Sequence, residues 1–463
     1  MTPPLIPLTV AAQAESRKRL PFGFGSRFFI ALLLGLIWLV PAWWSPKLIA
    51  AMFLWDAFVL LAWFIDLRRL PLPQLLEARR IWKSPLSFGR SNSATIDLRN
   101  SSGIPIRASI IDETPLALRE TPPALSLAVR PGRTALDEYS ILPVRRGDST
   151  VGRIFLRYQT SLGIAERWAV ADLSQSVRVL PDLEQAKRHA LYLIRSRQIE
   201  MEKRRRRQRG GGREFETLRG YREGDEPRDI CWTATARRHQ LMTRVYQAER
   251  SQTVWIVVDA GRLLRAQVED TDRGIRATKL DYGVDAALSL AQVAAQSGDQ
   301  VALLAYGRSI QQLVGAGRGP RHIRKLLDSL ALVHGEAAEA NHALAARVLL
   351  EAQSRRSLIV WITDFAETAM TPEVIEYATR MTQRHVVVFA AMSQPDLFAV
   401  AAGVPETEVE MFRHTAALEV VERRELLLRR LRQRGVLAID LAPGDLASAL
   451  VNKYLEVKDR SLL

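Results

Sequence analysis

The strongest hydrophobic pattern in the chain lies near its start, where two apolar runs follow each other. Residues 28–44 read FFIALLLGLIWLVPAWW without a charge, and residues 48–65 carry one charged residue, Asp56. Each run is roughly 17–18 residues long, the lower limit for a helix that crosses a bilayer core. The pattern therefore predicts a two-helix transmembrane hairpin over 28–66. The alternative is a helical hairpin buried in a soluble protein.

Basic residues flank this segment on both sides. They are Arg17, Lys18, Arg19 and Arg27 before it, and Arg68, Arg69, Arg79, Arg80 and Lys83 after it. By the positive-inside rule, both flanks face the cytoplasm, so residues 1–27 are predicted to be a basic cytoplasmic tail. A carboxylate at mid-span is costly. Asp56 is therefore predicted to pack against the first helix, protonated or hydrogen-bonded, and a transport or signalling carboxylate is the alternative.

Two segments of different character follow the apolar runs. Residues 84–182 carry short apolar or alternating runs between turn residues such as Pro131-Gly132, a pattern that predicts an immunoglobulin-like β-sandwich. Residues 183–209 lack Gly and Pro and predict a basic helical connector. Its end is a basic arm of Lys203, Arg204, Arg205, Arg206, Arg207 and Arg209. The arm could bind anionic lipid or nucleic acid, or stay solvated; without interleaved aromatic residues, lipid is favoured over nucleic acid.

Residues 251–463 show continuous apolar runs that alternate with helical patterns. The predicted strands cover 253–259, 300–306, 357–363, 385–391 and 436–441, and the predicted helices cover 279–296, 321–330, 342–353, 417–434 and 445–457. Such runs are typical of a mostly parallel sheet with helices on both faces. Asp259 and Asp364 follow two of these strands, at the edge where open α/β sheets bind ligands. They could hold Mg²⁺, or cap helices and pair with arginines.

Composition narrows the chemistry further. The net charge of +15 favours an acidic partner or surface, and the one cysteine, Cys231, excludes an intramolecular disulfide and a multi-cysteine metal site. The chain has no P-loop, no Gly-x-Ser-x-Gly and no His-Glu-x-x-His motif. Its seven histidines show no ligand spacing. The sequence therefore predicts a non-enzymatic protein without a cofactor, in which a bound Mg²⁺ is the exception to be tested.

A strand that ends in Asp259 and a later strand that ends in Thr363-Asp364 resemble a von Willebrand factor A domain. The resemblance implies a Rossmann-like sheet and a metal-ion-dependent adhesion site of the form Asp-x-Ser-x-Ser. Here Gly261 and Leu263 stand at the two serine positions, and Arg262 lies between them. The site is therefore degenerate, and a cation-dependent protein-binding module is the second interpretation of this domain.

Residues 210–250 carry a longer signature. It includes Glu214, Phe215, Leu218, Arg219, Tyr221, Gly224, Asp225, Arg228, Trp232 and Arg237. This pattern resembles the bacterial domain-of-unknown-function family 58, with departures at Cys231 and Thr233. Apolar anchors and charges of both signs at short spacing predict a strap packed across a sheet and held by Arg–carboxylate pairs. A charged docking face for a partner is the alternative.

The resemblance to this family covers most of the chain and implies a function. Its members combine a membrane hairpin, a β-sandwich, the signature and a von Willebrand A-like domain, and their genes accompany MoxR-type AAA+ ATPases. The resemblance therefore implies an adaptor or co-chaperone of such an ATPase at the bacterial inner membrane, with protein–protein interaction as its activity. Anionic lipid is a further predicted partner, and nucleic acid is disfavoured.

Overall fold

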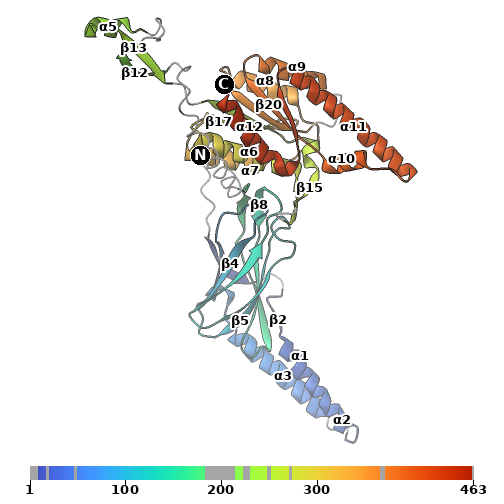
Figure 1. Cartoon of the computed structure of the whole chain (residues 1–463). Coiled ribbons are helices and arrows are strands. Elements are labelled where there is room, and N and C mark those ends of the chain that lie inside the picture. Colours follow the sequence, from blue (N-terminus) through green and yellow to red (C-terminus); the bar gives the residue numbers. More distant parts are fainter. Residues whose placement is uncertain are drawn as a thin grey trace. The chain divides into compact units, whose positions relative to one another are not determined.

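The computed structural model describes residues 9–16, 20–45, 49–182, 214–222, 230–247, 252–270, 274–364 and 371–460. The chain divides into two compact units, Met1–Leu180 and Pro181–Leu463. In Figure 1 the first unit runs from blue to cyan and the second from green to red. The first unit is rich in strands and carries apolar helices, and the second is mixed α/β. The predicted fold class is confirmed at this level.

The apolar helices of the first unit differ in length. The first apolar run is divided into α1 (Ser26–Gly35), the 3-10 turn η1 (Leu36–Trp38) and α2 (Leu39–Ala42). The second forms one continuous helix, α3 (Ile49–Arg69). Among the described helices, α3 alone is long and apolar enough to cross a membrane. One helix of spanning length is thus present, and the second crossing stays a prediction.

Helices α1 and α3 pack closely against each other at Gly35. A Cβ atom at this position would lie 2.8 Å from Asp56 Oδ1 and 2.8 Å from the Trp55 ring. The indole N–H of Trp55 donates a hydrogen bond of 2.8 Å to the Ala31 carbonyl. Small residues permit this kind of close approach between apolar helices. Asp56 therefore packs against the first helix, as predicted, but its buried Oδ1 has no hydrogen-bond partner in the described structure.

The strands of the first unit form one large sheet and a small one. The large sheet has the order β6-β5-β9-β10-β1-β3-β4-β7, with β2 also on β10, and β8 pairs with β11. The elements are β1 (Thr9–Ser16), β2 (Phe22–Phe24), η3 (Pro73–Leu75), β3 (Leu76–Trp82), β4 (Asn92–Asn100), β5 (Ile106–Asp112), β6 (Ala124–Val129), β7 (Thr134–Ile141), β8 (Gly147–Val151), β9 (Ile154–Gln159), β10 (Ala165–Ala171) and β11 (Gln175–Val179).

Strand β1 corrects two predicted boundaries. Its first part, Thr9–Gln13, pairs with β3, and Ala14–Ser16 pair with β10, so β1 joins the two halves of the large sheet. The β-rich unit therefore starts well before residue 84, and residues 9–16 and 22–24 of the predicted tail are strands of the sheet. The alternation of small apolar and polar residues in β1 is weak, and it carries little strand signal beside the charges that flank it.

The second unit is built on a six-stranded sheet of order β18-β17-β14-β19-β20-β21. Its strands are β14 (Thr253–Asp259), β17 (Gln300–Tyr306), β18 (Ile310–Gly317), β19 (Leu358–Thr363), β20 (Val386–Met392) and β21 (Leu437–Leu441). All pairs are parallel except β17 with β18, which is antiparallel. The inner strands are buried along nearly their whole length because helices cover both faces.

The helices of this unit are α6 (Lys279–Gln296), α7 (Pro320–Leu332), α8 (His342–Ala352), α9 (Thr371–Thr382), α10 (Pro395–Ala402), α11 (Glu408–Gln433) and α12 (Leu446–Asp459). Trp255 and Trp361 belong to a core cluster with buried residues of α8, α9 and α11. Helix α6 contacts α7, α12 and β14. Shorter elements are η5 (Arg262–Arg265), β15 (Gln267–Asp270), β16 (Ile275–Thr278) and η6 (Pro443–Asp445).

Helices α10 and α11 pack together and form an arm (Figure 1). Helix α11 begins at Glu408, nine residues before the predicted start at 417. Thr407 and Glu410 form a capping box at this observed start. Its buried residues begin at Ala417, so its first turns lie outside the core. The first turns carry apolar residues, Val409, Met411 and Phe412, but leave them exposed, so the predicted core helix covers only the later, buried part of α11.

The signature segment forms an antiparallel ribbon. Strands β12 (Glu214–Gly220) and β13 (Met242–Gln247) pair, and the short helix α5 (Trp232–Arg238) lies between them in the chain. The basic connector over 183–209 lies outside the described residues.

Candidate functional site

The carboxyl ends of β14 and β19 bring the two predicted aspartates close together. These strands are parallel neighbours, with Val258 opposite Ile362, so Asp259 and Thr363 lie side by side. The Thr363 hydroxyl donates to Asp259 Oδ2 at 2.6 Å, and the backbone N–H of Gly261 donates to Asp259 Oδ1 at 2.7 Å. Both oxygens of Asp259 therefore accept hydrogen bonds inside the protein.

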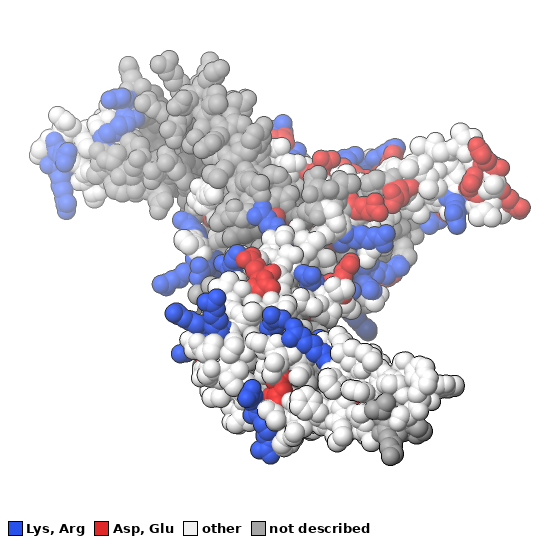
Figure 2. Space-filling model, turned by 90° about the horizontal axis from the view of Figure 1, so that it is seen from below, with Lys and Arg blue, Asp and Glu red and all other residues white. Residues whose placement is uncertain are grey.

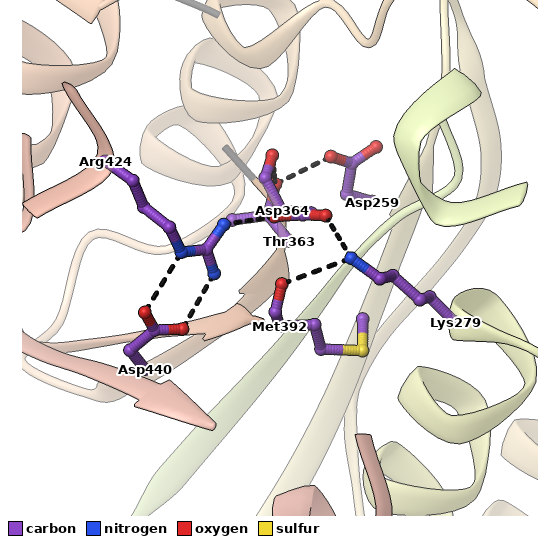
Figure 3. A network of polar contacts seen from close by, with 7 residues as sticks. All are labelled: Asp259, Lys279, Thr363, Asp364, Met392, Arg424 and Asp440. Atoms are coloured by element: carbon purple, nitrogen blue, oxygen red, sulfur yellow. Dashed lines mark hydrogen bonds and ion pairs between the residues drawn. The ribbon is translucent and has the colours of Figure 1, made fainter. Parts of the chain in front are cut away.

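Asp364 lies at the centre of a buried ion network (Figure 3). Lys279 Nζ contacts Asp364 Oδ2 at 2.6 Å, and the guanidinium of Arg424 contacts Asp364 Oδ1. Arg424 also donates two hydrogen bonds to Asp440, of 3.0 and 2.7 Å. Two cations and two carboxylates thus balance each other without any added ion.

Lys279 lies at a position that disfavours a cation, and its contacts compensate for this. Lys279 is the first residue of α6, directly after the capping Thr278, whose side chain bonds reciprocally with Asp281. A cation at a helix N-terminus opposes the helix dipole, and here the side chain is 1% exposed. Its contacts with Asp364 and with the Met392 carbonyl, at 3.4 Å, compensate for this position.

Burial dominates the electrostatics of the site. It raises the pKa of Asp259 and lowers the pKa of Lys279, although Asp364 favours the charged lysine. Burial also opposes the charged form of Arg424, but its hydrogen bonds to Asp440 and the charge of Asp364 outweigh this and raise its pKa. The network therefore depends on each cation keeping its carboxylate.

A divalent cation does not fit this arrangement. The oxygens of both aspartates already have partners, and the Lys279 ammonium lies on the carboxylate that a metal would need. At the first serine position of the adhesion motif, a Cβ on Gly261 would lie 2.9 Å from Ala340, so a serine ligand has no space without a shift. No group of three or more metal-ligating side chains occurs among the described residues. Arg262, beside the motif, pairs outward with Glu339 at 3.2 Å.

A second polar group, absent from the sequence predictions, lies beside Asp259 and consists of the buried Tyr306 and the half-buried His342. The Tyr306 hydroxyl contacts His342 Nδ1 at 2.7 Å and accepts a 2.6 Å hydrogen bond from the Trp361 indole. Burial lowers the pKa of His342, and the nearby Asp259 counteracts this shift. The histidine starts α8 and the tyrosine ends β17, so no sequence spacing links them. The one sequence signal for this group is the position of Tyr306 at the end of a predicted strand.

The signature residues are only partly described. Glu214, Phe215 and Leu218 lie on β12, for which the backbone pairing is described, whereas Gly224, Asp225 and Arg228 lie outside the described residues. The exposed side chains are those of Tyr221, Arg237 and Trp232, the last 67% exposed. Arg219 donates to the Gly220 carbonyl. Two predicted anchors of a strap, Tyr221 and Trp232, are thus not buried.

The remaining predicted residues fall outside this site. The basic arm, Lys203 to Arg209, lies outside the described residues. Cys231 is buried before α5, where its sulfur contacts the Thr233 hydroxyl at 3.4 Å.

Comparison with known proteins connects the chain to a family. Residues 217–402 match the family described as "Protein of unknown function DUF58". The uncharacterized protein YeaD of Bacillus subtilis (strain 168) is 23% identical over 302 residues, which cover 62% of this chain and 70% of YeaD.

Solved structures give weaker matches. The conserved hypothetical protein BatB from Bacteroides thetaiotaomicron matches with a TM-score of 0.30 and 12% identity, over 45% of this chain and 99% of its own. An uncharacterized membrane spanning protein from Vibrio fischeri matches with a TM-score of 0.18 and 12% identity, over 45% and 98%. Scores this low carry no argument. The sequence matches show that residues 217–402 are similar to the DUF58 family of proteins of unknown function.

Proposed function

We propose that this protein is a membrane-anchored, non-enzymatic interaction protein, an adaptor or co-chaperone of a MoxR-type AAA+ ATPase in the assembly or maturation of protein complexes. The α/β unit is its von Willebrand A-like binding domain. The ATPase is proposed as the partner because the resemblance to the family implies it. The observation that carries an interaction role is the exposed apolar surface of the α10–α11 arm.

This arm presents large apolar side chains where a core helix would bury them. Val404 is 88% exposed and Phe412 is 69% exposed, and Val400, Val409 and Met411 are exposed with them. Three glutamates, Glu406, Glu408 and Glu410, lie at the same end of the arm, and Figure 2 shows acidic side chains gathered there. Contiguous apolar patches with a polar rim are typical of protein interaction sites. The acidic rim favours a partner with a basic rim and disfavours an anionic membrane.

The strand-end network supports a role without catalysis. Its carboxylates, ammonium and guanidinium are matched to one another inside the described structure, which leaves none of them poised toward a substrate. The same contacts disfavour the cation-dependent module, because Lys279 holds Asp364. Binding of lipid or nucleic acid through the basic arm over 203–209 rests on residues outside the described structure.

Membrane anchoring rests on α3 and its flanks. The helix has spanning length, and arginines stand on both sides of the apolar segment. We infer an inner-membrane protein with two crossings, whose termini and soluble units face the cytoplasm.

Binding of the full-length protein to the purified MoxR-type ATPase of the same organism tests the proposal. The double variant Val404→Asp, Phe412→Asp is expected to weaken binding at least tenfold. Leu136→Asp, at a β7 side chain that is also 69% exposed, is the matched control and is expected to bind as the wild type does. Equal binding by all three proteins would remove the arm from the interface, and no binding by the wild type would refute the adaptor role.

A further inference from the structure

A group of exposed arginines of the first unit lies at the end from which α3 emerges. Strand β3 begins shortly after α3, and its first residue, Leu76, pairs with Asn100 at the end of β4. Next to it, Arg99 pairs with Thr134 at the start of β7, and Ile106 pairs with Val129. The loops over 101–105, 130–133 and 160–164 therefore gather at the α3 end of the sheet.

We call this end the headgroup face and define it by its exposed arginines, Arg68, Arg69, Arg99, Arg107, Arg130 and Arg133. None of the six forms an ion pair with another described residue. The acidic groups at this end are matched elsewhere: Glu77 pairs with Arg79 at 2.9 Å, and Glu166 contacts Arg157 at 3.8 Å. Figure 2, which views the molecule from the side of the apolar helices, shows Lys and Arg predominating around them.

Hydrogen bonds fix this face to the apolar helices. Asp66, one turn before the end of α3, is buried and accepts hydrogen bonds from the Thr160 hydroxyl at 2.6 Å and from the backbone N–H groups of Ile164 and Ala165 at 3.2 and 2.9 Å. Arg27, at the start of α1, donates to the carbonyls of residues 161 and 162, each at 3.0 Å. The sheet therefore holds a fixed position on the end of α3.

A cavity of about 210 Å³ opens at this junction. It is lined by Asp66, Arg69, Ile104, Pro105, Thr160, Ser161 and Leu162. The Asp66 carboxylate is occupied by its three donors, so the groups left for a ligand are the Arg69 guanidinium and the Ser161 hydroxyl, beside an apolar wall. A water molecule takes about 30 Å³ of liquid. The cavity therefore has room for a phosphate ester together with part of its glycerol.

The level of the cavity along α3 identifies the source of that phosphate. The apolar run of α3 ends at Ile65, and the cavity residues Asp66 and Arg69 follow within one helical turn. If α3 spans the membrane, this turn lies among the lipid headgroups. The apolar side chains of Leu72 and Leu162 are exposed at the same end, as expected for a surface that touches the interface.

We propose that the headgroup face binds anionic phospholipid, with one phosphate in the Arg69 cavity. The inference rests on the membrane anchoring in the proposed function and not on its ATPase partner. The proposal gives these arginines a binding role in addition to their effect on membrane topology, because the bound anionic lipid holds the β-rich unit against the membrane surface.

The test uses the full-length protein in nanodiscs of phosphatidylcholine, with or without phosphatidylglycerol, followed by native mass spectrometry of the lipids that it retains. We expect preferential retention of phosphatidylglycerol. Arg69→Gln is expected to weaken it about fivefold, the usual effect of one basic residue at an anionic membrane surface. Arg145→Gln, an exposed arginine beyond the opposite end of β7, is the matched control and should have no effect.

Each other outcome has a distinct meaning. Equal retention of both lipids, or equal losses in Arg69→Gln and Arg145→Gln, overturns the lipid site but leaves the anchor intact. Failure of the wild type to enter the nanodiscs overturns the anchor and the lipid site together. Inorganic phosphate that protects the backbone of 160–164 from hydrogen exchange as well as phosphatidylglycerol does would make free phosphate the ligand and refute the lipid.

Discussion

The buried pair of Lys279 and Asp364 gives the sharpest test of the charge-balanced strand-end site. Lys279→Met keeps the length of the side chain and removes its charge, and Asp364→Asn removes the partner charge at constant size. Both wild-type side chains are at most 2% exposed, and their charged atoms are 2.6 Å apart. The two single variants and the double variant form a double-mutant cycle.

The expected magnitudes follow from this geometry. At an effective dielectric constant of about 20, two charges 2.6 Å apart attract by about 6 kcal/mol. Desolvation of each ion costs several kcal/mol, so the intact pair is close to neutral in its net effect. Lys279→Met leaves Asp364 with Arg424 as its one cationic partner, and we expect a loss of about 3–5 kcal/mol in the free energy of unfolding. The double variant should stay within about 2 kcal/mol of the wild type, because Arg424 keeps Asp440.

Hydrogen exchange of the full-length protein in detergent measures these changes. Peptides from β14 and β19 report the opening of the sheet because both strands are buried along nearly their whole length. Millimolar Mg²⁺ or a chelator should leave exchange of the wild type unchanged. The reasoning is refuted if Lys279→Met costs less than about 1 kcal/mol, if the double variant loses the sum of the single losses, or if Mg²⁺ slows exchange in the wild type.

Three further predictions concern single side chains. Burial lowers the pKa of His342 below its ordinary 6.5, so the unfolded chain takes up a proton that the folded chain does not. The free energy of unfolding should therefore fall as the pH drops below 6.5. His342→Gln should reduce this pH dependence, measured by urea unfolding followed by tryptophan fluorescence. Gly261→Ser should destabilise the α/β unit by about 1–3 kcal/mol through its contact with Ala340, and a gain of Mg²⁺ binding in calorimetry would contradict the fit argued above. Asp66→Ala leaves three donors without their acceptor and should destabilise the junction of α3 and the sheet by about 3 kcal/mol or more. The loss should appear as faster hydrogen exchange over 160–165. Unchanged hydrogen exchange there would show that the junction does not depend on this carboxylate.

Continuous apolar runs made the α/β unit predictable. Residues 254–258 are all apolar and precede the carboxylate of Asp259, and such a pattern is typical of a buried strand. The edge strand β18 was missed because its Gln and Gly residues carry no strand pattern. The helical start of α11 was missed because its first turns bury nothing.

The site was predictable only in part for a different reason. Strand ends placed Asp259 and Asp364 together because parallel neighbours end at one edge of the sheet. The cationic partners of Asp364, Lys279 and Arg424, lie 85 and 60 residues from it along the chain. Neither belongs to a motif, and a lysine at the start of a helix usually faces solvent. Contacts of this kind follow from packing, which no local pattern encodes.

The central claim is that the protein binds its partner through the α10–α11 arm and without a metal at the strand ends. The most direct measurement compares two full-length variants in binding to the MoxR-type ATPase at constant Mg²⁺. One is Val404→Asp, Phe412→Asp, and the other is Lys279→Met, Asp364→Asn, which removes the carboxylate that a metal would need. The account predicts at least tenfold weaker binding by the arm variant and unchanged binding by the strand-end variant. Loss of binding by the strand-end variant, with the arm variant unaffected, would contradict it.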